Sequence, residues 1–165
     1  MANVRNVLAA SDIHEVTTVK QGVLGQVVET ADGRKYRYAK NGATPLAAGA
    51  EIEKSATSAA TSTTDGKVPV AGSKVVVDNA VTASNAPKYE DGILTVNSAR
   101  YLVEGVTDKV IALHDKVGVA IADGVATSLA ANQYCGVVVK DSGASIGFAE
   151  VAVPANAYFW AYVSA

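Results

Sequence analysis

The chain is short of the residues that cross-link a protein or anchor it in a membrane. It has one cysteine in 165 residues, which excludes an internal disulfide and any thiolate metal cluster built within the chain. Its longest apolar runs, such as 117–122, are far shorter than the ~20 residues that cross a bilayer. Its first residues contain no signal-peptide core. We therefore expect a soluble protein, made in the cytoplasm, with no membrane partner.

Charge is scarce as well. Charged residues make up 18% of the chain, and 14 lysines and arginines against 16 acidic residues leave a net charge of -2. A weakly acidic chain has no electrostatic attraction for phosphate backbones, so we expect no nucleic-acid partner. Apolar residues make up 49%, with alanine and valine far commoner than leucine. Because small and β-branched side chains fit pleated sheets better than helical cores, this composition favours strands.

Motifs for catalysis are missing too. The sequence has no Walker loop, no dinucleotide-binding glycine motif and no nucleophile elbow. Its two histidines, His14 and His114, stand far apart, and residues 12–14 lack the second ligand pair that a metal site needs. We expect His114 to form a surface ion pair with Asp115, and Cys135 to be packed inside a strand. The sequence therefore predicts no enzyme, no metal and no cofactor.

Many short apolar runs separated by polar turns predict an all-β fold, a small antiparallel β-barrel or sandwich with an N-terminal arm and at most one or two short helices. We expect the arm at 1–22 and a single β domain at 23–165. The Ser/Thr-rich stretch, about 55–66, reads as a flexible loop or an edge strand. A short helix is possible near 126–132. Further strands are expected at 74–78, 93–97, 101–104, 109–114, 117–122, 134–140, 146–153 and 157–163.

The first part of this domain predicts a hairpin. Asp32 and Gly33 separate two strand-like runs, a pattern typical of a two-residue type I′ turn. The register of such a turn pairs Val27 with Tyr38. It places Val27, Tyr36 and Tyr38 together on the inner face, because opposite residues share a face.

The last strand is apolar on both faces. Tyr158, Trp160 and Tyr162 alternate with Phe159 and Ala161. One interpretation is a central strand of the core with both faces covered. The other is that the aromatic face meets another subunit, because Tyr and Trp are enriched in interface cores.

The hairpin region resembles a known family. The stretch LGQVVETADGRKYRYAKNG at 24–42, followed by Leu46 and Gly49, resembles the capsid decoration (cement) proteins of tailed bacteriophages. The ending at 157–163 is similar to the aromatic closing strand of that group. The resemblance implies a structural protein of the virion that binds the outer capsid surface as a homotrimer and clamps neighbouring major capsid subunits.

The resemblance also assigns roles to residues. The shell contact is expected from the arm, at Asn3, Val4, Arg5, Val7 and Leu8. The subunit interface is expected at Tyr158, Trp160 and Tyr162 on a different ground, the aromatic face of the last strand. The hairpin residues carry over as scaffold: Asp32, Gly33, Tyr36 and Tyr38.

Two other functions stay open. The chain is alternatively a carbohydrate- or receptor-binding β module of a phage fibre or tail, which needs exposed aromatic side chains that stack on sugars. A small hydrolase is the third hypothesis, and it would need a spatial cluster drawn from His14, His114 and Cys135.

Overall fold

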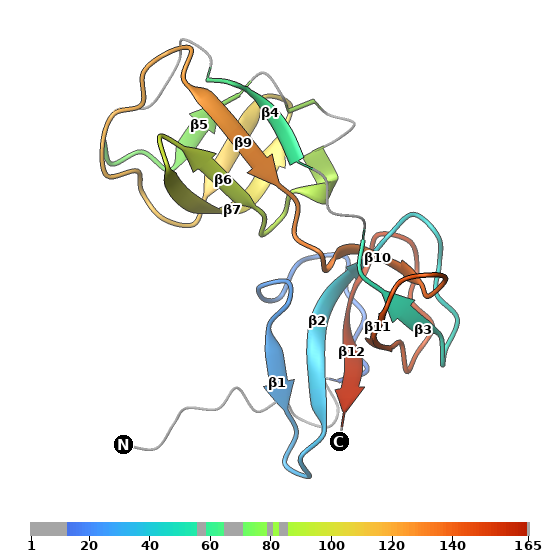
Figure 1. Cartoon of the computed structure of the whole chain (residues 1–165). Helices are drawn as coiled ribbons and strands as arrows, with labels where there is room; N and C mark the ends of the chain where they lie inside the picture. Colours follow the sequence, from blue (N-terminus) through green and yellow to red (C-terminus); the bar gives the residue numbers. More distant parts are fainter. Residues whose placement is uncertain (1–12, 56–58, 65–70, 79–80, 83–85, 165) are drawn as a thin grey trace. The chain divides into compact units, whose positions relative to one another are not determined.

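The computed structural model confirms the all-β prediction. The residues that it describes form twelve strands and one 3₁₀ turn, Ala86–Lys88 (Figure 1). The residues that the structure describes are 13–55, 59–64, 71–78, 81–82 and 86–164. In this described part, no helix is long and apolar enough to span a membrane.

The chain divides into two compact units, which differs from the single domain expected over 23–165. Unit 1 takes 1–56 and 133–165, and unit 2 takes 57–132. The physical reason is strand pairing. Every strand between 57 and 132 pairs only within that stretch. In the sequence, unit 2 is therefore inserted between strands β3 and β10 of unit 1.

Unit 1 is built around a closed barrel. Its strands are β1 (Val27–Glu29), β2 (Lys35–Asn41), β3 (Glu51–Glu53), β10 (Cys135–Val139), β11 (Ser145–Phe148) and β12 (Tyr158–Ser164). They follow the order β1-β2-β10-β3-β11-β12, and β12 pairs again with β2, so that five strands close and β1 extends the edge of β2. All pairs are antiparallel except β2 with β10, which is parallel.

The barrel interior is filled mostly by small and β-branched side chains, with Leu46 and Phe159 as the larger ones. A narrow barrel leaves room for little more than the side chains that fill it. Its buried cluster is made of Ala39, Leu46, Ile52, Val137, Ala149, Val153, Ala157, Phe159 and Ala161.

Closure of the barrel depends on a glycine in β11. Gly147 has a φ of 141°, and a Cβ atom there would lie 2.4 Å from the carbonyl oxygen of Tyr162 in β12. Only a residue without a side chain lets the two backbones approach this closely.

The predicted hairpin is present, but its register differs by one residue. Tyr36 lies opposite Val28, and Val27 lies opposite Arg37. The turn has three residues rather than two, because the Thr30 amide donates to the Arg34 carbonyl at 2.8 Å.

The turn type explains this shift. Gly33 has a φ of 89°, whereas Asp32 is not in the left-handed region that a type I′ turn requires at both positions. The Asp32 carboxylate instead accepts hydrogen bonds from the side chains of Thr30 and Arg34. Since a one-residue slip exchanges the faces of a strand, Val27 is 43% exposed and Val28 is buried.

Tyr36 and Tyr38 are buried, but outside the barrel. They alternate along β2 with Ala39, which belongs to the interior cluster, so they point to the outer face. Residues 13–26, here called the cover segment, lie over this face. Ile13 joins the cluster of Tyr36, and Leu24 joins the cluster of Tyr38.

The cover segment includes half of the predicted arm. Thr17 forms a β-bridge with Tyr158, and the Gln21 amide donates to the Tyr38 hydroxyl at 2.8 Å. Residues 13–22 are therefore packed on the barrel. The predicted shell-contact residues lie outside the described residues: Asn3, Val4, Arg5, Val7 and Leu8.

Unit 2 is a second antiparallel sheet. Its strands are β4 (Ala59–Thr63), β5 (Val75–Val77), β6 (Ile93–Val96), β7 (Ala99–Thr107), β8 (Val110–Leu113) and β9 (Ala126–Ala130). The order is β4-β9-β6-β7-β8-β5, and a bridge between Thr64 and Asp78 links the ends of the two outer strands. Its core includes Val76, Tyr89, Leu94, Val96, Val103, Ile111, Leu113 and Leu129.

Three local expectations are settled in unit 2. The Ser/Thr-rich stretch contains an edge strand, β4, paired to β9. The possible helix near 126–132 is wrong, because tertiary pairing makes this stretch strand β9. The strand expected at 117–122 is also wrong: this stretch is irregular and packs Val117 and Ile121 into the core.

Candidate functional site

An aromatic layer covers the outside of β2 and β12. The pairing of these strands places Trp160 opposite Tyr38 and Tyr162 opposite Tyr36. The ring centroids of Tyr38 and Trp160 are 4.8 Å apart, and those of Tyr36 and Tyr162 are 5.6 Å apart in an edge-on arrangement. Such tilted and edge-on contacts are the favourable geometries for aromatic pairs. The layer therefore ties the hairpin to the last strand of the chain.

The predicted interface residues belong to this layer. Tyr158 is buried, while Trp160 and Tyr162 are half-buried. The cover segment supplies Ile13 and Leu24 to the layer, and the interior cluster covers the opposite face of β12. Both faces of this strand are thus packed within the chain, as a central strand requires. Trp160 and Tyr162 are nevertheless partly accessible to a partner.

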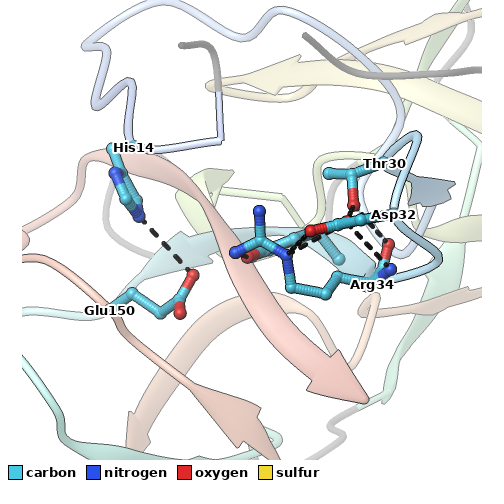
Figure 2. Close-up of polar contacts among 6 residues, drawn as sticks. His14, Thr30, Asp32, Arg34 and Glu150 are labelled. Carbon is cyan, nitrogen blue, oxygen red and sulfur yellow. Dashed lines mark hydrogen bonds and ion pairs between the residues drawn. The ribbon is translucent and has the colours of Figure 1, made fainter. Parts of the chain in front are cut away.

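A polar cluster stands at one end of this layer (Figure 2). Arg34 contacts both carboxylate oxygens of Asp32, at 2.9 and 3.1 Å, and its Nη1 donates to the Tyr36 hydroxyl at 3.1 Å. His14 Nε2 lies 3.6 Å from Glu150 Oε1. Glu150 also lies near enough to the Tyr36 hydroxyl to raise its pKa. The cluster thus links three parts of the chain: the hairpin turn, the loop after β11 and the cover segment.

The pKa values in this cluster favour a structural role. The Thr30 hydroxyl and then Arg34 lower the pKa of Asp32 from 3.8 to about 2. Burial, followed by the nearby Glu150 carboxylate, raises the pKa of Tyr36 to about 12. At neutral pH Asp32 is therefore charged and Tyr36 keeps its proton. Neither group titrates near neutrality, where a general acid or base works best.

A second polar contact occurs in unit 2. His114 Nε2 lies 3.0 Å from Asp91 Oδ1, so the partner of this histidine is Asp91 and not Asp115 as expected. Asp91 is buried, with a φ of 54°, in the turn before β6, and Asn132 donates to its carbonyl oxygen at 3.0 Å. The turn brings Asp91 to the end of β8, a contact that neighbours in sequence do not reveal.

The remaining candidate residues fall in both units. Cys135 is buried beside Tyr38 and Tyr158 in unit 1, as expected for a packed thiol. His14 belongs to unit 1 and His114 to unit 2. Across the described ranges, no group of three or more His, Cys, Asp and Glu side chains is placed to hold a metal ion.

Sequence reasoning missed the residues that the tertiary structure brings to the hairpin. Glu150 is far from His14 and Tyr36 in sequence and carries no motif. Ile13 had a weak signal, as an isolated aliphatic residue in a polar stretch.

Comparison with known proteins identifies no relative. No family model matches the chain, no curated protein matches it, and no solved structure matches it.

Proposed function

We propose that this chain decorates the outside of a tailed-bacteriophage capsid and stabilises it by holding neighbouring major capsid subunits together, without catalysing a reaction. One observation carries the proposal. The two segments that resemble decoration proteins, 24–42 and 157–163, are distant in sequence but form the adjacent strands β2 and β12. Their conspicuous aromatic residues meet in one layer. The two segments that carry the resemblance therefore lie side by side in one sheet, which supports the proposal.

The packing of the cover segment supports a clamp. Ile13 is 3% exposed where it packs against the aromatic layer, and His14 contacts Glu150. A shell contact made by the arm would pull directly on these anchors, so load on the arm would pass to the barrel. A protein that binds the assembled lattice better than free subunits stabilises the assembled state by mass action. In a trimer, three weak contacts add through effective concentration.

Co-sedimentation tests this function. Purified chain is mixed with expanded, DNA-free shells of the phage whose genome encodes it, and the pellet is examined by electron microscopy. We expect saturable binding and a higher temperature of shell disruption. Paired substitutions Val4→Asp and Leu8→Asp in the arm should weaken binding. Val119→Asp is the matched control, since Val119 is 64% exposed in unit 2. A chain that stays in the supernatant at every concentration refutes the proposal.

A further inference from the structure

One row of paired residues crosses the outer face of the unit 1 barrel. Val28 lies opposite Tyr36, Tyr36 opposite Tyr162, Tyr162 opposite Phe148, and Phe148 opposite Glu51. Directly opposite residues lie on the same face of a sheet. The row is therefore apolar along four strands and ends at a carboxylate on β3.

The cover segment occupies only part of this row. Ile13 packs in the cluster of Val28 and Tyr36, both of which are buried. At the other end Phe148 is 39% exposed. Val138 on β10 is 42% exposed and lies opposite Glu53, hence on the same face. Two accessible apolar side chains thus stand on either side of β3.

Carboxylates surround these side chains. On β3, Glu51 lies opposite Phe148 and Glu53 lies opposite Val138. The side chain of Glu51 makes no hydrogen bond or ion pair with any residue that the structure describes. Glu150 is two residues beyond Phe148, and its side chain is 32% exposed. Glu53 is engaged, since its Oε2 accepts two backbone amides. Lys140 lies beside Glu51 on β10, where its amide donates to the Glu51 carbonyl. Carboxylates thus outnumber lysines around Phe148 and Val138, with Glu51, Glu53 and Glu150 against Lys140 and Lys54.

The chain itself shows what this kind of surface accepts. Ile13 places an aliphatic side chain on the aromatic row, and the next residue, His14, faces Glu150 at 3.6 Å. An aliphatic residue followed by an imidazole thus contacts both the apolar row and the carboxylate beside it. The uncovered continuation of the row, at Phe148 and Glu51, repeats this combination.

We propose that the β11 face, formed by Val138, Phe148, Glu51 and Glu150, binds an extended segment of a partner protein that carries aliphatic residues flanked by lysine or arginine. The inference rests on the proposed function, in which the partner is a subunit of the capsid shell. Burial of the exposed apolar surface supplies affinity. The carboxylates select a basic partner over an acidic one.

Peptide titration of the full chain tests the proposal. Isotope-labelled protein is titrated with the acetylated, amidated peptides KVIVK and EVIVE while amide signals are followed by NMR. KVIVK should shift the amides of Val138, Phe148 and Glu51 saturably, and EVIVE should not. Phe148→Ser should weaken binding by about tenfold, the size expected for an apolar anchor. Val119→Ser, on unit 2, should leave it unchanged.

A charge reversal separates recognition from structural damage. Glu51→Lys should reverse the preference between the two peptides, which a loss of folding cannot do. Equal shifts with both peptides, shifts on another surface, or no shifts because residues 1–12 already fill the face would overturn the proposal. If KVIVK binds but the chain never co-sediments with shells, only the proposed function fails. If Phe148→Ser binds shells as wild type does, only the docking surface fails.

Discussion

Gly147→Ala tests the closure of the unit 1 barrel. Gly147 lies in β11, where its φ of 141° is a conformation that side chains rarely adopt. An added Cβ would stand 2.4 Å from the carbonyl oxygen of Tyr162, which belongs to the backbone of β12 and cannot rotate away. Accommodating it requires β11 to move from β12, at the pair formed by Phe148 and Tyr162.

The expected cost follows from these two effects. Holding a residue with a side chain in a sparsely populated backbone region costs about 1–3 kcal/mol. Forcing an extra carbon into a packed contact costs about 1–3 kcal/mol more. The sum, about 2–6 kcal/mol, is a large part of the ~5–15 kcal/mol that stabilises a typical domain. Gly49→Ala is the matched control, since Gly49 has a φ of 85° but no neighbour within 4 Å. It should cost only about 1–2 kcal/mol.

Urea unfolding followed by tryptophan fluorescence measures the difference. Trp160 is the single tryptophan of the chain and belongs to unit 1, so its signal reports that unit. We expect the midpoint of Gly147→Ala to fall well below that of Gly49→Ala, with the slopes unchanged. Equal midpoints would refute the close approach of β11 to β12, and with it the closed barrel.

Four further predictions concern the polar contacts, the oligomer and the alternative function. Folding lowers the pKa of Asp32 from 3.8 to about 2, so its carboxylate stabilises unit 1 above about pH 4. That stabilisation is lost as the pH falls through 2. The unfolding midpoints of wild type and Asp32→Asn should therefore converge as the pH falls from about 4 to about 2. Asp91→Asn removes the carboxylate that faces His114 and should destabilise unit 2 by about 1.5–3 kcal/mol. The loss should appear as faster hydrogen exchange in β6 and β8. Unchanged exchange would contradict the contact between Asp91 and His114. Light scattering should give a homotrimer of 16.8 kDa chains, and a strict monomer would defeat that expectation. Glycans should not quench Trp160 saturably, because it is half-buried against Tyr38; saturable quenching would favour the carbohydrate-binding module.

The candidate site was only partly visible in the sequence. Alternation predicted that Tyr36 and Tyr38 share a buried face, and that Tyr158, Trp160 and Tyr162 share another. It did not reveal that the two faces are one layer, because strand pairing across more than a hundred residues leaves no local signal. Glu150 and Asp91 were missed as partners of histidines for the same reason: each contact joins segments that only the closed sheets bring together.

The sequence by itself determined the all-β class, the hairpin around Gly33 and the positions of most strands, because composition, turn residues and period-two alternation are local properties. Tertiary structure decided the rest. Closing five strands into a barrel put Tyr36 outside and Ala39 inside, and the competition between a two- and a three-residue turn set the hairpin register. Residues 126–130 form a strand and not the expected helix, because they pair with two neighbouring strands. The strands within 57–132 pair with one another, so this stretch forms a unit of its own where local patterns indicated a single domain.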